Sequence, residues 1–163
     1  MKLVITEKPS VAWDIARVLN ATGKAKGYIY NEEYYITWAL GHLVTLEDPH
    51  GQNPNWSEKD WTLDDLPMLP KDFKYKVIDN VKEQFEVIKD LIHRPEITEL
   101  INAGDDGREG EYIQRLIYEK AGNTKPVMRL RFSSMDDGTI KKAFQNLVPA
   151  SVMDNIYESA KCR

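Results

Sequence analysis

The sequence predicts an α/β protein with a largely parallel sheet, and two observations support this prediction. Short apolar segments, typical of buried strands, alternate along the chain with amphipathic helical segments, and this order is typical of βαβ units. Acidic residues directly follow two of the predicted strands, where open α/β sheets usually carry their functional side chains. With 163 residues, the chain is long enough for one domain with a sizeable core.

The first third of the chain predicts one helix among three strands. Lys2–Thr6 has the apolar, β-branched composition of a buried strand. The apolar residues between positions 11 and 19 recur at helical spacing, with Pro9 or Ser10 at the start and Gly23 as the expected stop. Two further strands are predicted on either side of Gly41 and His42, at residues 34–38 and 43–46.

A long irregular insertion at about 48–76 separates these elements from the second half. It holds most of the prolines together with Trp56 and Trp61, and long loops in compact domains are usually functional or disordered. Beyond it, the periodicity predicts alternating helices and strands: a helix at 77–92, a strand at 97–103, a helix at 111–120 that stops at Gly122, a strand at 127–132 with one exposed face, a helix from about 136 to 147, and a last helix from about 151.

The composition excludes several classes of protein. A net charge of −4 argues against a domain that wraps duplex DNA non-specifically, because phosphate neutralisation needs a basic face. No apolar run approaches the length of a bilayer span, and the first residues lack the apolar core of a secretory signal. Cys162 stands alone, so it forms no disulfide framework, and we expect a reducing, cytoplasmic setting.

The segment 101–111, Ile-Asn-Ala-Gly-Asp-Asp-Gly-Arg-Glu-Gly-Glu, carries four carboxylates in seven positions. Such a cluster after a strand suits a hard divalent cation, which prefers oxygen ligands. The alternative is that Glu109 and Glu111 simply favour a helix N-terminus. Glu7 follows the first strand as Asp105 follows a later one, so both are expected at the same edge of the sheet.

Two cations accompany these acids. Lys8 is either a solvated surface lysine or a cation directed at whatever the acids hold, and Arg108 either neutralises its acidic neighbours or binds a phosphate through its guanidinium fork. Other site classes lack their motifs. No glycine-rich dinucleotide motif or phosphate-binding loop occurs, and neither the three histidines nor the serines form a recognisable hydrolase triad.

Several segments, in the same order, resemble the N-terminal part of bacterial topoisomerase III, and the resemblance covers essentially the whole chain. The segments are Glu-Lys-Pro-Ser-Val-Ala at 7–12, Trp-Ala-Leu-Gly-His-Leu-Val-Thr-Leu at 38–46, Trp61 ahead of Leu66, Pro67 and Pro70, the acidic run at 103–111, and Arg-Phe-Ser-Ser at 131–134. This resemblance implies a Toprim fold, which is a small, mostly parallel sheet with helices on both faces. It implies a Toprim domain at 1–150 and the start of a linker helix to a further domain at 151–163.

The resemblance also implies a site and a reaction. Glu7, Asp105 and Glu109 correspond to the Mg²⁺-binding acids, while Gly107 stands where the fuller motif has another aspartate, which favours one Mg²⁺ over two. Lys8 is expected beside them as a further catalytic residue, and Trp61, His42, Lys8 and Arg108 are expected to contact DNA. Type IA topoisomerases cleave and rejoin single-stranded DNA through a 5′-phosphotyrosine without ATP.

None of the chain's tyrosines matches the family's nucleophile motif, which is expected beyond position 163. The implied partners are single-stranded or negatively supercoiled DNA and the remaining domains of the same polypeptide, with no membrane and a cytoplasmic, nucleoid-associated location. The chain alone is therefore expected to be inactive. Two alternatives stay open: a stand-alone Toprim nuclease or primase-like phosphotransferase, and a non-enzymatic interaction module whose acids are surface residues.

Overall fold

The computed structural model describes residues 1–56 and 61–162. In this part of the chain, the main sheet has seven strands in the order β2-β3-β4-β1-β7-β8-β9, and β5 and β6 form a separate two-stranded ribbon. The strands are β1 Lys2–Thr6, β2 Gly23–Ala25, β3 Tyr28–Tyr30, β4 Tyr34–Trp38, β5 Val44–Leu46, β6 Tyr75–Val77, β7 Glu99–Ala103, β8 Val127–Arg129 and β9 Val148–Pro149.

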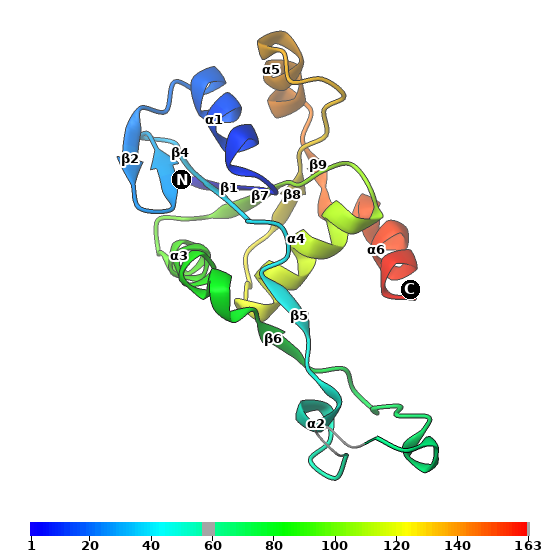
Figure 1. The fold of residues 1–163 in the computed structure, drawn as a ribbon. Helices are drawn as coiled ribbons and strands as arrows, with labels where there is room; N and C mark the ends of the chain where they lie inside the picture. Colours follow the sequence, from blue (N-terminus) through cyan, green and yellow to red (C-terminus); the bar gives the residue numbers. More distant parts are fainter. Residues whose placement is uncertain (57–60, 163) are drawn as a thin grey trace.

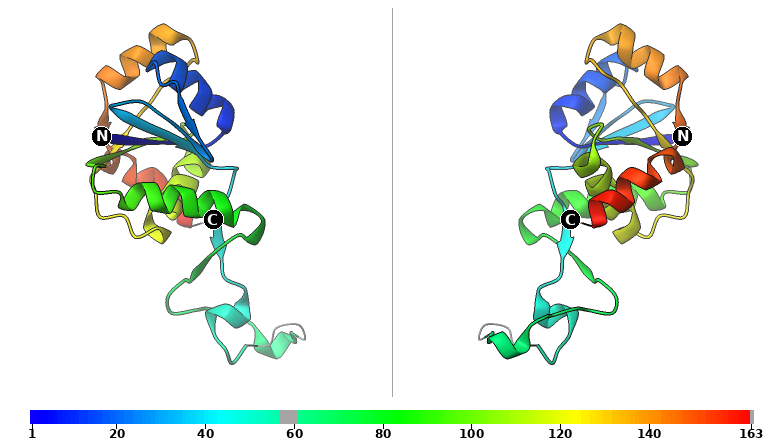
Figure 2. Two further views of the ribbon diagram at one scale, coloured as in Figure 1. Left: turned by 90° about the vertical axis from the view of Figure 1, so that its left-hand side faces the viewer. Right: turned by 90° about the vertical axis from the view of Figure 1, so that its right-hand side faces the viewer.

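Helices cover both faces of this sheet (Figures 1 and 2), so the predicted α/β architecture, a mostly parallel sheet with helices on both faces, is confirmed. The helices are α1 Pro9–Val18, α2 Pro49–Gln52, α3 Lys82–His93, α4 Arg108–Lys120, α5 Asp137–Gln145 and α6 Asp154–Lys161, with short 3-10 turns at Leu63–Asp65, Asp79–Val81 and Ala150–Met153. The central strands β4, β1, β7 and β8 run parallel, while β2, β3 and β9 add antiparallel edges. Each described helix is too short or too polar to cross a bilayer.

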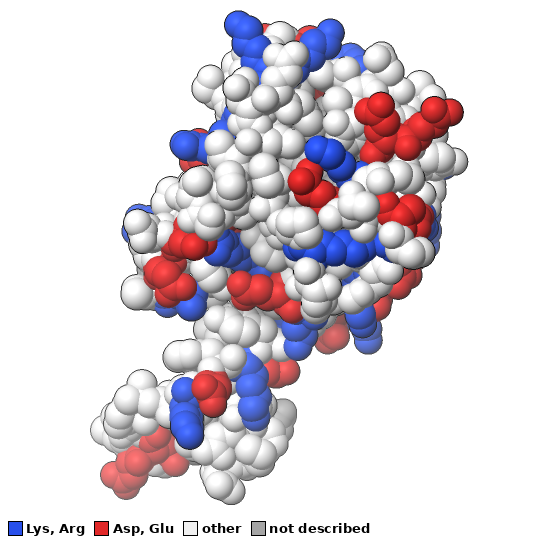
Figure 3. Space-filling view, turned by 180° about the vertical axis from the view of Figure 1, so that it is seen from behind, with Lys and Arg blue, Asp and Glu red and all other residues white. Residues whose placement is uncertain are grey.

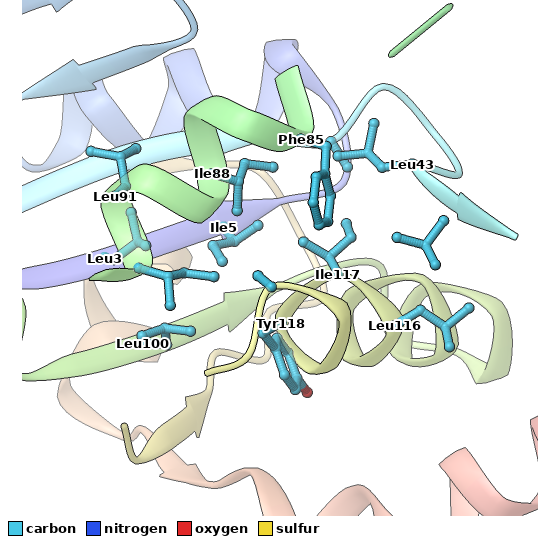
Figure 4. Close-up of a cluster of buried hydrophobic side chains, with 14 of the residues drawn as sticks. Leu3, Ile5, Leu43, Phe85, Ile88, Leu91, Leu100, Leu116, Ile117 and Tyr118 are labelled. Carbon is cyan, nitrogen blue, oxygen red and sulfur yellow. The ribbon is translucent and has the colours of Figure 1, made fainter. Parts of the chain in front are cut away.

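Two apolar clusters, one on each face, hold the sheet between the helices. Successive residues of β1 point to opposite faces, so Leu3 and Ile5 enter one cluster while Val4 enters the other. Figure 4 shows the first cluster, in which Ile88 of α3 and Ile117 of α4 pack onto β1. The second cluster lies under α1 and α5. Because both faces are covered, the inner parts of β1 and β7 are mostly apolar, with Asn102 of β7 as a buried polar residue.

Several predicted boundaries are wrong, and each error has a local cause. The first helix ends at Val18 and not near Gly23, because Asn20 takes a positive φ of 54° and turns the chain, while Gly23 begins β2. The third helix begins at Lys82, since residues 77–81 form the end of β6 and a 3-10 turn. The helix α4 begins at Arg108, three residues earlier than predicted.

The insertion predicted at 48–76 forms an arm that projects from the body at the end of the β5–β6 ribbon (Figure 1). Residues 57–60 of this insertion, and residue 163 of the predicted linker helix, lie outside the described residues. The arm carries large apolar side chains that are more than half exposed, namely Trp61, Leu63, Leu66, Leu69 and Phe73. These side chains lie outside the two apolar clusters that stabilise the body.

Candidate metal and phosphate site

Strand pairing brings the two predicted acids together. The strands β1 and β7 are parallel neighbours in register, with Thr6 opposite Ala103, so the chain leaves both strands at the same edge. Glu7 and the turn 104–107 follow directly. The Asp105 amide donates a hydrogen bond of 3.2 Å to Glu7 Oε2, so the expected juxtaposition of Glu7 and Asp105 is present.

Lys8 lies against both carboxylates. Its Nζ donates a 2.8 Å hydrogen bond to Asp105 Oδ2 and is 4.0 Å from Glu7 Oε1. The side chains of Lys8 and Asp105 are 55% and 54% exposed, whereas that of Glu7 is only 13% exposed. The hydrogen bond to Asp105 is the main cause that raises the pKa of Lys8, with the charges of Asp105 and Glu7 adding to it. A cationic group therefore occupies the space between the two acids.

The acidic turn packs tightly onto the first turn of α4. A Cβ added to Gly110 would lie 2.4 Å from the Asp105 carbonyl oxygen and 2.9 Å from Glu7 Oε2. Real Cβ atoms do not approach backbone so closely, so only glycine lets the helix lie under the turn. Gly110, five residues after Asp105, thus allows the first turn of α4 to pack directly against the Asp105 backbone.

Arg129 holds the backbone of the same turn from below. Its side chain is completely buried, and its Nη1 donates to the carbonyl oxygens of Gly104 at 2.9 Å and Asn102 at 3.0 Å. Its Nη2 donates to the carbonyl oxygen of Asp105 at 3.0 Å. The prediction that the strand at 127–132 has an exposed face is therefore wrong at this residue. Two consecutive carbonyl groups of the turn are fixed by one guanidinium group.

Glu111 balances the charge of Arg129 and is itself fully buried. Its Oε2 lies 3.4 Å from Arg129 Nε and accepts a hydrogen bond of 3.0 Å from Asn102 Nδ2. Its Oε1 accepts from Arg115 Nε at 2.8 Å. The simple view of Glu111 as a residue that favours a helix N-terminus misses this role. The Glu111–Arg115 spacing of four residues was the available sequence signal, but nothing local identified Arg129 as the third member.

The two remaining acids of the run point away from Glu7. Asp106 Oδ2 accepts two hydrogen bonds from Arg131, from Nε at 3.1 Å and Nη2 at 2.9 Å. Glu109 Oε1 is 3.4 Å from His42 Nε2, and its side chain is 79% exposed. The structure therefore does not bring the Glu109 carboxylate to the pair Glu7 and Asp105.

The predicted DNA-contacting residues fall in two places. His42 and Arg108 line a hollow of about 380 Å³ beside the acidic turn, together with Leu46, Glu109, Tyr112, Ala160 and Lys161. Trp61 lies on the arm and is 52% exposed. On the face seen in Figure 3, basic and acidic side chains are interspersed, and no broad basic surface is visible.

The donor set fits a weakly held hard cation. Among the described residues, no three side chains of His, Cys, Asp or Glu lie close enough together to hold a metal ion. Glu7 and Asp105 supply two carboxylates, and the ammonium group of Lys8 stands in for a cation between them. Mg²⁺ commonly binds through one or two carboxylates, with water and substrate phosphate completing its shell.

Comparison with known proteins shows which family and which fold this chain shares. The model of the Toprim domain family matches residues 2–135. The chain is 48% identical over 161 residues to DNA topoisomerase 3 of Bacillus anthracis and 45% identical to that of Staphylococcus epidermidis, covering 99% of this chain. It spans about a fifth of the length of these relatives, 22% in each case. Full-length topoisomerase I of Thermotoga maritima shares the fold, with a TM-score of 0.57 and 23% identity over 92% of this chain and 21% of that one.

Proposed function

Because this chain belongs to the Toprim domain family, we propose that it forms the Mg²⁺-binding part of a type IA DNA topoisomerase. The observation that carries the proposal is the convergence of Glu7 and Asp105 at the ends of two neighbouring parallel strands. The similarity to curated topoisomerases over 99% of the chain supports the same reading. The activity, DNA substrate and partner domains of the relatives are part of this proposal.

The proposed reaction exchanges one phosphodiester for another. A tyrosine hydroxyl attacks a phosphorus atom of single-stranded DNA and the 3′-hydroxyl leaves; religation reverses this, so the bond energy is conserved without ATP. A bound Mg²⁺ would supply charge stabilisation at the phosphate oxygens. Glu7 and Asp105 would hold the ion, and Lys8 would contact the phosphate. Glu7, the less exposed of the two acids, would exchange a proton with the 3′-hydroxyl.

The nucleophile is proposed to come from another part of a longer polypeptide. The hydroxyl of Tyr112 lies 3.5 Å from that of Tyr75, and the hydroxyl of Tyr157 donates to Glu119 at 2.9 Å. Desolvation is the main cause that raises the pKa of Tyr112 and Tyr157, so both hydroxyls lose a proton less readily than an ordinary tyrosine does. Neither is suited to attack a phosphate. The greater length of the relatives supports a nucleophile supplied by a further domain.

Binding of the DNA strand is proposed to be shared with those domains. A net charge of −4 leaves little electrostatic attraction for nucleic acid in this chain. His42 and Arg108 beside the acidic turn, and Trp61 on the arm, are the proposed contacts, with a phosphate fork and base stacking as their chemistry. Glu109 is proposed as the third acid of the site. A change of rotamer away from His42 would be needed, and its exposed side chain permits one. A cytoplasmic, nucleoid-associated location belongs to the same proposal.

A chimeric enzyme tests this function. The matching segment of the Bacillus anthracis topoisomerase is replaced by this chain, and relaxation of negatively supercoiled plasmid is measured in Mg²⁺. We expect relaxation by the chimera, and loss of relaxation with Glu7→Gln or Asp105→Asn. Glu96→Gln serves as the matched control, because Glu96 lies at the opposite end of the sheet, where its backbone carbonyl accepts from the Met1 amino group and its carboxylate accepts from the Tyr35 hydroxyl.

The outcomes separate the alternatives. A folded chimera that relaxes DNA equally well with Asp105→Asn would contradict the site assignment. Nicking of plasmid by the 163-residue chain alone, dependent on Mg²⁺ and on Asp105, would instead identify a stand-alone Toprim nuclease. A chain that neither binds Mg²⁺ nor supports relaxation would favour an interaction module.

A further inference from the structure

We propose that Lys8 is an exchangeable counter-ion of the acidic site, which gives up its contact with Asp105 when a divalent cation binds and then becomes available to a substrate phosphate. This inference rests on the proposed function, because it assumes that Glu7 and Asp105 hold a metal ion. It adds a prediction that the function alone does not make: removal of an active-site cation strengthens metal binding.

The argument begins with the position of the ammonium group. Lys8 Nζ is 2.8 Å from Asp105 Oδ2 and 4.0 Å from Glu7 Oε1, so it faces both carboxylates at once. A cation shared by these carboxylates would need the same space. An ammonium group and a metal ion in this space would repel each other strongly. Water screens this repulsion less near Glu7, whose side chain is only 13% exposed. The two positions are therefore mutually exclusive.

Lys8 is suited to leave, and the neighbouring arginines are not. It precedes the first turn of α1 in an extended conformation, with φ −136° and ψ 147°, and its side chain is 55% exposed. A lysine has a flexible stem and carries its charge at a single point, so it can swing without disturbing the backbone. Arg129 is buried and holds carbonyl groups of the turn, while Arg131 donates two hydrogen bonds to Asp106.

The carboxylates also remain in place when Lys8 moves. The Asp105 amide donates to Glu7 Oε2, and Arg129 holds the carbonyl oxygens of Gly104 and Asp105. None of these contacts involves the ammonium group. Exchange thus costs the exposed ion pair with Asp105 and the longer contact with Glu7, and it leaves the geometry of the two acids intact. Exposed ion pairs favour their closed form by about two- to fivefold in population.

Titration calorimetry with Mn²⁺ on the 163-residue chain tests the exchange. The apparent dissociation constant is the intrinsic one divided by the fraction of molecules in which Lys8 is away from Asp105. We therefore expect Lys8→Met to tighten Mn²⁺ binding about three- to sixfold, and Lys8→Arg to leave it unchanged or weaker. Arg108→Met is the matched control, since it removes the same charge from the start of α4, beside the acidic turn; we expect it to change the affinity by less than about twofold.

A second measurement follows the group directly. In crystals of the wild-type chain soaked with Mn²⁺, Lys8 Nζ should lie beyond hydrogen-bond distance of Asp105 Oδ2. Mn²⁺ bound with the 2.8 Å contact intact would overturn the proposal. So would weaker or unchanged binding in Lys8→Met, or equal tightening in Lys8→Met and Arg108→Met. Failure of both wild type and Lys8→Met to bind Mn²⁺ would instead refute the proposed metal site itself.

Discussion

Replacing Arg129 by methionine should destabilise the domain by about 3–5 kcal/mol, the usual cost of leaving one partner of a buried ion pair. The guanidinium group donates to four backbone carbonyl groups, of Asn102, Gly104, Asp105 and Leu130. Two of these keep another donor, because the Leu130 amide reaches Asn102 and the Gly107 amide reaches Asp105. The carbonyl groups of Gly104 and Leu130 lose the charged donor that Arg129 provides, and each loss costs about 1 kcal/mol or more of stability.

Loss of charge compensation adds to this cost. Glu111 is fully buried, and without Arg129 its carboxylate keeps Arg115 and Asn102 as its partners among the described residues. Burial is the main cause that lowers the pKa of Arg129, while Glu111 and Asp106 raise it; an arginine nevertheless remains charged at neutral pH. The charge is therefore present in the native state, and its removal leaves a carboxylate poorly compensated.

Urea unfolding followed by circular dichroism measures the effect. If the variant and the wild type have equal m-values, the change in the urea midpoint reports the change in stability. Arg131→Met is the matched control: its side chain is 55% exposed and pairs with Asp106, so we expect a loss of less than about 1 kcal/mol. Arg129→Lys should fall between the two, since it restores a charge but not the fork. A loss in Arg129→Met within about 1 kcal/mol of that in Arg131→Met would refute the reasoning.

Three further predictions concern the acidic turn and the helix α5. Gly110→Ala should destabilise the domain by about 1–3 kcal/mol in urea unfolding, because its Cβ would meet the Asp105 backbone. Gly107→Ala is the control, since a Cβ there has no atom within 4 Å, and its stability should lie within about 0.5 kcal/mol of wild type. Similar losses in the two variants would contradict the packing argument. Gly107→Asp should tighten Mn²⁺ binding several-fold in calorimetry by adding a carboxylate to the turn, and an unchanged affinity would show that position 107 does not face the ion. Hydrogen bonds from the Thr139 side chain and amide lower the pKa of Asp136 to about 2. Asp136 is the N-cap of α5, and its side chain accepts from the Thr139 amide. The stabilisation from this cap is therefore present above the unfolded pKa near 4 and is lost as the pH falls towards 2. Asp136→Asn should flatten this fall in the urea midpoint between pH 4 and pH 2; an unaltered slope would exclude Asp136 as its source.

The central elements of the fold were predictable because their patterns are strong. The strands β1 and β7 are mostly apolar and five residues long, and α3 and α4 each carry apolar residues at helical spacing. The strands β2, β3 and β9 are only two or three residues long, and their pairing with neighbours defines them more than their own composition does. Such short edges cannot be recognised locally, because tertiary context decides them.

The site was predictable to the extent that topology places it. Acids that follow parallel strands must meet at one edge, and this alone brought Glu7 to Asp105. The supporting residues could not be predicted in the same way. Arg129 stands in an alternating strand where a charged residue is normally exposed, and burial of a charge becomes reasonable only when its partner Glu111 is known to lie opposite, on another element.

The backbone of the acidic turn is held by many contacts, whereas few side chains are available as metal ligands, and this difference has a chemical consequence. Below the turn, Arg129, Glu111 and Gly110 fix the backbone at several points, so Asp105 has little freedom to move relative to Glu7. Above the turn, the chain offers two carboxylates, and Lys8 lies against both of them. Under the proposed function, a site that is rigid but sparsely supplied with ligands would bind Mg²⁺ weakly by itself, since the ion would retain most of its water. Phosphate oxygens of a bound strand would supply the missing ligands, while the displaced Lys8 would supply a further positive charge. Metal and strand should therefore bind cooperatively, because each adds contacts that the other lacks.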